Sequence, residues 1–129
     1  MRLLLDSHIL LAMALKRLPD VSLAAARMLG RREIQAWASV ASLWEIAIKT
    51  RLGKLDPGMP LDDLPDFLES VGLVILPVTA GHALTTVEPL PPTRDPFDRL
   101  LLAQCEVEQL SLLTLDRALR NHPLAARLR

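Results

Sequence analysis

The chain has 129 residues, of which 50% are apolar and 23% charged, and its 15 basic and 15 acidic side chains give a formal net charge of zero. This length predicts a single domain over residues 1–129, and the high apolar fraction excludes an intrinsically disordered chain. A balanced charge also excludes a global positive field that attracts nucleic acid, so any such binding must come from a local patch.

Apolar runs, caps and breakers predict an alternation of strands and helices along the chain. The first quarter predicts a strand at 2–5, a helix capped by Ser7 that ends before Pro19, a helix at 22–31 and a strand at 34–38. The middle predicts a helix at 41–52 closed by Gly53, a helix at 61–71 interrupted near Pro65, a strand at 73–76 and a helix at 79–87. The remainder predicts an irregular loop at 88–93, a helix from Asp95-Pro96 through Glu108, a strand at 110–115 and a short helix after Asp116.

Strands that alternate with helices indicate a parallel sheet covered on both faces. We therefore expect an α/β fold, a three-layer α/β/α sandwich with a central, mostly parallel sheet of four to five strands. In such sheets ligands bind beyond the carboxyl ends of the strands. Asp6 and Asp116 both follow leucine-rich strands directly, so both are expected at that edge.

Cysteine content and hydropathy indicate the compartment. Cys105 is the only cysteine, which precludes an intrachain disulfide and reads as a small hydrophobic residue on a helix stripe. No apolar run approaches the roughly 20 residues needed to span a bilayer, and the N-terminus lacks a signal-peptide cleavage pattern. We expect a cytoplasmic protein with no membrane association.

The two strand-end acids have an ordinary interpretation as helix caps. Asp6 could cap the first helix, although Ser7 is also available for that role. Asp116 could cap the short helix that is expected after it. Their shared position at one sheet edge favours a functional interpretation of both.

Glu45 has an equally ordinary interpretation, because Lys49 lies four residues further on and can form a surface ion pair with it. Apolar residues nevertheless surround this helix on nearly all sides, which predicts that it is largely buried. A carboxylate on a buried helix needs a compensating cation, and a metal ion can supply one.

Asp95 and Asp98 both suit the start of a helix, where carboxylates complement the helix dipole. Capping explains Asp95 completely but explains Asp98 only in part. Asp98 shares one helical stripe with apolar residues at spacings of three, four and seven, namely Leu101, Leu102 and Cys105. Asp98 is therefore expected to point inward.

Four converging carboxylates without matching basic residues repel one another and favour a bound cation. Oxygen-only ligands indicate Mg²⁺ or Mn²⁺ rather than zinc. The three histidines, which we expect at the surface or in caps, lack ligand spacing: His8, His82 and His122. Ser7 has no His-Asp arrangement to activate it, and the chain has no Gly-rich phosphate loop.

Four segments together resemble the PIN-domain family and, within it, the VapC-like toxins of bacterial toxin–antitoxin pairs. They are Asp6-Ser7, SLWEIAIK at 42–49, RDPFDRLLLAQ at 94–104 and LLTLD at 112–116. The order and spacing of the two long middle segments are the specific part of this resemblance. The chain departs from the common pattern at Ser7, where threonine is frequent, at Thr93, where histidine is frequent, and in lacking an aromatic residue after Asp116.

The resemblance implies a PIN-like nuclease domain that hydrolyses RNA phosphodiester bonds with Mg²⁺ or Mn²⁺. Its acidic set, catalytic and metal-binding, falls on Asp6, Glu45, Asp98 and Asp116. It also implies a cognate antitoxin protein as partner and a homodimer. We further expect Ser7 and Thr114 to orient the carboxylates, and Lys49, Arg94 and Arg99 to hold the RNA backbone.

Two other classes of function fit parts of the sequence. A receiver-like phosphorylation switch also gathers acids at a sheet edge, but residues 73–78 offer no phospho-accepting Asp and no Lys follows Lys54. A catalytically silent α/β interaction module is the other alternative, and the complete set of four acids argues against it.

Overall fold

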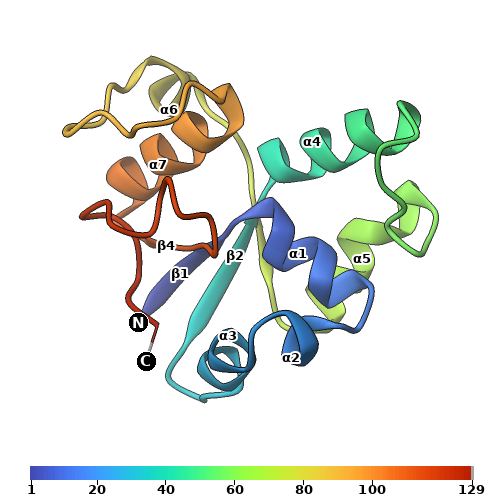
Figure 1. Cartoon of the computed structure of the whole chain (residues 1–129). Helices are drawn as coiled ribbons and strands as arrows, with labels where there is room; N and C mark the ends of the chain where they lie inside the picture. The colour runs from blue at the N-terminus through green and yellow to red at the C-terminus, as the bar shows by residue number, and fades with distance from the viewer. Residues whose placement is uncertain (129) are drawn as a thin grey trace.

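A four-stranded sheet forms the centre of the computed structural model, which describes residues 1–128 (Figure 1). In chain order the strands are β1 (Arg2–Leu5), β2 (Gln35–Ser39), β3 (Val74–Leu76) and β4 (Ser111–Leu113). Their order in the sheet is β3-β2-β1-β4, and all three neighbouring pairs are parallel. The expected parallel sheet is confirmed with four strands. An isolated parallel bridge from Leu112 to Ala125 extends it beyond β4.

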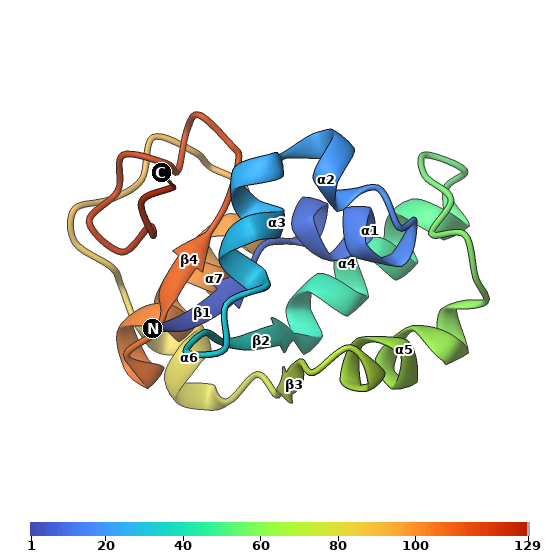
Figure 2. The same cartoon turned by 90° about the horizontal axis from the view of Figure 1, so that it is seen from below.

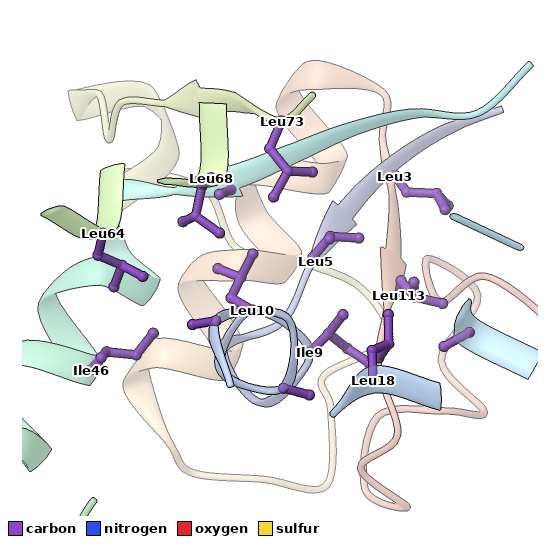
Figure 3. Packing of buried hydrophobic residues seen from close by; sticks show 14 of the residues in the cluster. Leu3, Leu5, Ile9, Leu10, Leu18, Ile46, Leu64, Leu68, Leu73 and Leu113 are labelled. Carbon is purple, nitrogen blue, oxygen red and sulfur yellow. The ribbon is translucent and has the colours of Figure 1, made fainter. Parts of the chain in front are cut away.

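Helices cover both faces of the sheet, which confirms the three-layer sandwich. One face packs against α1 (Ser7–Ala14), α2 (Leu18–Val21), α3 (Leu23–Leu29) and α5 (Leu64–Ser70), and the other packs against α7 (Pro96–Glu108), which in turn contacts α6 (Ala80–Leu84). Alternation along β1 explains this, because Leu3 and Leu5 enter the first core (Figure 3) and Leu4 enters the second. All three leucines are fully buried, as expected for a strand covered on both faces.

Several helix predictions need correction. The helix expected at 79–87 ends at Leu84, because β-branched Thr85, Thr86 and Val87 follow and the Thr85 hydroxyl bonds back to the Gly81 carbonyl at 2.7 Å. No helix follows Asp116 up to residue 128, where the described part of the chain ends. Its carboxylate instead accepts the Ala118 amide at 2.9 Å and starts a series of turns.

Prolines begin helices in this chain rather than only ending them. Pro19 lies in the first turn of α2, a short helix that was not predicted. Pro65 opens α5 after a short 3-10 helix, η1 (Leu61–Asp63), which confirms the expected interruption there. None of the helices within residues 1–128 is long and apolar enough to cross a membrane.

The expectation that the helix at 41–52 is largely buried is wrong. This helix, α4 (Val40–Arg51), continues directly from β2 (Figure 2) and buries only one face. Its Trp44 side chain is 61% exposed and packs edge-on against Phe97, with ring centroids 5.7 Å apart. Glu45 nevertheless lies on the buried face of α4.

Strand register fixes the edge of the sheet where the acids gather. Leu5 pairs with Ala38 of β2 and with Leu113 of β4, so the three strands end level with one another. The Asp6 amide also donates to the Leu113 carbonyl at 3.0 Å. The next residues along these strands therefore meet at one place, with Asp6 in the middle.

A candidate acidic active site

A small cavity of about 50 Å³ lies at this edge of the sheet and brings together all four predicted acids. Its lining residues are Asp6, Ser7, His8, Glu45, Lys49, Asp95, Asp98 and Asp116. They come from the start of α1, the middle of α4, the start of α7 and the segment after β4. The cavity thus joins segments that are far apart in the sequence.

Asp6 is held rigidly by the chain around it. Its carboxylate is 4% exposed and accepts the amides of His8 at 3.0 Å and Ile9 at 3.2 Å, while its other oxygen accepts the Thr114 hydroxyl. Burial raises the pKa of Asp6, and these hydrogen bonds oppose the rise. Asp6 is therefore the cap of α1, and the prediction that Ser7 caps this helix is wrong.

Glu45 is also fully engaged, by one neutral and one charged donor. The Ser7 hydroxyl donates to one carboxylate oxygen at 2.6 Å, and the Lys49 ammonium donates to the other at 2.7 Å. The hydrogen bond to Glu45 raises the pKa of Lys49, as do the charges of Glu45, Asp95 and Asp98, while burial lowers it. The ordinary ion pair thus exists, so burial of Glu45 alone does not demand a metal ion.

Asp98 points inward as its position on the helix predicts. The other members of its stripe are fully or almost fully buried, namely Leu101, Leu102 and Cys105. Burial raises the pKa of Cys105 to about 12, so this thiol is the small hydrophobic residue that was expected. Asp95 caps α7 by accepting the Phe97 amide at 2.8 Å, as predicted.

The charge of Asp98 is poorly compensated. Burial first, and then the negative charges of Asp95, Asp116 and Glu45, together raise its pKa to about 6. The one opposing contact is a long hydrogen bond of 3.4 Å from the Thr93 hydroxyl.

Asp116 is exposed and is placed through its backbone. Its amide donates to the Thr114 hydroxyl oxygen at 3.1 Å, and that same hydroxyl donates to Asp6. Thr114 is 2% exposed and so ties the two strand-end acids together from beneath the cavity.

The basic residues proposed to hold RNA do not all reach the site. Lys49 lines the cavity, but Arg94 and Arg99 do not. The Arg99 side chain donates to the Thr93 carbonyl at 2.9 Å and lines a separate cavity of about 120 Å³, and Arg94 is exposed.

Two histidines expected at the surface or in caps are buried, and His82 is a cap. His82 is 1% exposed and forms a capping box with Thr79, and its outer ring nitrogen lies 2.7 Å from the Glu108 carboxylate. His122 is 8% exposed and lies 2.7 Å from the Pro89 carbonyl. The prediction of a capping role is confirmed for His82, whereas buried His122 is neither a surface residue nor a helix cap.

Sequence reasoning missed two members of the cavity, His8 and Asp95. Capping accounts for Asp95 without indicating that it also lines the site. His8 lies on the first turn of α1, directly after Asp6-Ser7, and that adjacency is the signal by which it could have been found.

The donor set fits a hard divalent cation in its chemistry. Five carboxylates surround the cavity and Lys49 supplies the one ammonium, so negative charge is in excess, and every carboxylate offers oxygen ligands. Within residues 1–128, however, no three His, Cys, Asp or Glu side chains are already arranged to hold a metal ion. Binding would require the carboxylates to draw together.

Comparisons with known proteins agree with this architecture. One chain of the VapBC2 complex from Rickettsia felis, solved bound to a DNA fragment from the promoter, superposes with a TM-score of 0.65 at 18% identity, covering 97% of this chain and 96% of that one. No curated protein sequence matches. The family model of the PIN domain matches residues 3–123, nearly the whole chain and all five acids of the cavity. The chain therefore belongs to the PIN-domain family.

Proposed function

We propose that this protein is a Mg²⁺- or Mn²⁺-dependent endoribonuclease that hydrolyses RNA phosphodiester bonds. The observation that carries the proposal is the gathering of five carboxylates around one cavity with a single ammonium among them. Such an excess of negative charge disfavours the metal-free state and favours a divalent cation. Membership of the PIN-domain family supports the same nuclease assignment.

Each acid has a part that follows from its surroundings. Asp6, Glu45 and Asp98 would bind the cation directly or through water, and Asp116 would complete the site. A bound divalent cation supplies positive charge to the scissile phosphate and acidifies the attacking water. Asp6 is fixed by its hydrogen bonds before any ligand arrives, so it sets the position of the others.

Two hydroxyl groups and the Lys49 ammonium donate hydrogen bonds to Asp6 and Glu45. The Ser7 hydroxyl orients Glu45, and the Thr114 hydroxyl orients Asp6, because each donates to a carboxylate oxygen. Lys49 compensates Glu45 until a cation replaces it, after which its ammonium is free to contact the RNA backbone.

RNA cleavage by the purified protein tests the proposal. Wild-type protein should cleave RNA with Mg²⁺ or Mn²⁺ and stop when EDTA is added. Asp98→Asn should lower the cleavage rate at least ~100-fold, because it removes a charged oxygen from the cation. Asp66→Asn is the matched control, an exposed acid in the first turn of α5, and should cleave at the wild-type rate. Wild-type activity in Asp98→Asn would overturn the assignment.

We also propose that the chain is the toxin of a toxin–antitoxin pair, held inactive by a cognate antitoxin, and that it forms a homodimer. The similarity in fold to a chain of a VapBC2 complex supports this. The exposed Trp44 and an adjoining groove of about 360 Å³ between α4 and the start of α5 offer an apolar surface for a protein partner. Expression should arrest growth only when Asp98 is intact, and sedimentation should give twice the monomer mass.

The two alternatives differ from this proposal in what they predict. A receiver-like switch has lost its support, because the chain belongs to the PIN-domain family. A silent interaction module predicts no Mn²⁺ binding by wild-type protein. Mn²⁺ binding that is lost on substitution of Glu45 would favour the nuclease.

A further inference from the structure

A second cavity, of about 420 Å³, opens directly beside the acidic cavity. The two cavities share four lining residues, Ser7, His8, Glu45 and Lys49. A ligand in the larger cavity would therefore touch groups that also face the five carboxylates. Its volume falls in the range of sites that hold small organic ligands.

The outer wall of this cavity is built by the way α4 ends. Gly53 has a left-handed backbone with φ of 73°, and its amide donates to the Thr50 carbonyl at 3.0 Å. The Lys54 amide then donates to the Lys49 carbonyl at 2.9 Å, which completes a Schellman motif. This turn folds the chain back, so that Lys54 and Leu55 line the same cavity as Lys49 in the last turn of α4.

The lining combines an apolar wall with a basic rim. Leu11 of α1, the buried Ile46 of α4 and the half-buried Leu55 give the apolar part. Lys54 is exposed at the rim of the cavity. Within residues 1–128, Lys49 and His82 are the only basic side chains that form ion pairs. The Lys54 ammonium is thus left for an anionic ligand.

A nucleotide of RNA has the matching chemistry, a flat base with apolar faces joined to a phosphate. We propose that this cavity binds the nucleotide next to the scissile phosphodiester, with Lys54 on its phosphate and Leu11 and Leu55 against its base. Through the fit of that base, the cavity sets which RNA sequences are cut. This inference rests on the proposed ribonuclease function, because continuity with the acidic cavity is what identifies the occupant as RNA.

The test uses short RNA oligonucleotides that differ only in the bases flanking a site cut by wild-type protein. Lys54→Ala should raise KM about tenfold, leave kcat within about twofold, and reduce the salt dependence of RNA binding by about one phosphate contact. Leu11→Trp should fill the cavity and remove the preference for one flanking base while cleavage continues. Arg51→Ala is the matched control, because Arg51 is an exposed cation three residues from Lys54 that does not line this cavity.

The outcomes separate this inference from the function on which it rests. Wild-type protein that cleaves no RNA with Mg²⁺ or Mn²⁺ would overturn both. Wild-type cleavage with the same KM, salt dependence and base preference in Lys54→Ala, Leu11→Trp and Arg51→Ala would overturn the nucleotide subsite alone. If Leu11→Trp loses all activity, its thermal unfolding shows whether the variant still folds. If it does not fold, the effect of Lys54→Ala on KM and salt dependence decides for or against the nucleotide subsite.

Discussion

The acidic cavity has two sides that differ in how far the chain itself compensates their charge. The inner pair, Asp6 and Glu45, is 4% and 7% exposed, and both carboxylates accept hydrogen bonds at each oxygen. The outer group, Asp95, Asp98 and Asp116, is half-buried or exposed and receives fewer donors. The comparison indicates that the inner pair supplies fixed geometry and the outer group supplies uncompensated charge.

Removing Asp6 should have the largest effect, because it deletes the cap of α1 and the centre of the inner pair. We expect Asp6→Ala to lower the free energy of unfolding by about 1–3 kcal/mol and the RNA cleavage rate at least ~100-fold. Chemical denaturation and single-turnover cleavage measure the two effects.

Ser22→Ala is the control for this prediction, because Ser22 caps α3 by accepting the Ala25 amide at 3.1 Å and lies outside the cavity. Ser22→Ala should lower the free energy of unfolding by about 1 kcal/mol and leave the RNA cleavage rate unchanged. If Asp6→Ala also kept its activity, Asp6 would be only a cap.

Thr114 and Thr93 offer a direct comparison of the two sides, since each hydroxyl donates to one acid of its side. Thr114→Val should lower the free energy of unfolding by about 1–2 kcal/mol, because it leaves one carboxylate oxygen of buried Asp6 without its donor. Thr93→Val should lower the free energy of unfolding by only about 0.5 kcal/mol, because the hydrogen bond from Thr93 to Asp98 is long and only partly buried.

Thr114→Ser keeps the hydroxyl and should restore most of the stability lost in Thr114→Val. Equal losses in Thr114→Val and Thr93→Val, measured by urea denaturation, would contradict the distinction between the inner pair and the outer group.

The positions of the acids could be predicted from the sequence more easily than the groups with which they form hydrogen bonds. The stripe through Asp98 depends only on helical periodicity, which local sequence determines, and it is confirmed. The cap of α1 was assigned to Ser7 because capping preferences do not distinguish two adjacent good caps. The backbone of Asp6 decides between them, being extended at φ −73° and ψ 169°, and that depends on the pairing of β1 with its neighbours.

The solvent exposure of α4 also could not be predicted from its local sequence. Its apolar residues surround the helix in sequence, but its packing against α1 and α7 leaves Trp44 exposed. The second cavity was not predicted for a similar reason. Gly53 was recognised as a helix end, but where the turn after it places Lys54 depends on the packing of α1 against α4.

Lys49 supplies the one ammonium of the acidic cavity. Removing it should leave the inner pair less compensated, and so closer in charge compensation to the outer group. Lys49→Met should lower the free energy of unfolding of the metal-free protein by about 1 kcal/mol, because Glu45 then keeps only its bond from Ser7. It should also raise Mn²⁺ affinity, because the competing ammonium is gone. Arg51→Met on the exposed face of the same helix should change neither. Weaker Mn²⁺ binding in a folded Lys49→Met protein would show that Lys49 supports the metal rather than competing with it.

Asp98 in the outer group should make the stability of the protein depend on pH. Its pKa is about 6 in the folded protein and about 3.8 when unfolded, so the folded protein binds the extra proton between these values. By linkage, stability falls as pH rises through this window and then stays level. Asp98→Asn removes the penalty, so in EDTA it should match wild-type near pH 4 and exceed it at pH 7 by about 1 kcal/mol, after allowance for partial exposure.

Calorimetry in EDTA should therefore give Asp98→Asn a Tm about 3–5 °C above wild-type at pH 7, with the gap closing toward pH 4. Saturating Mg²⁺ should reverse the sign, because the cation stabilises only the protein that retains the Asp98 carboxylate. The same substitution at Asp66, exposed in the first turn of α5, should leave the pH profile unchanged. A Tm difference that does not vary from pH 4 to pH 7 would mean that the outer group is already compensated. The contrast with the inner pair would then be lost, and with it the argument that uncompensated charge recruits the cation.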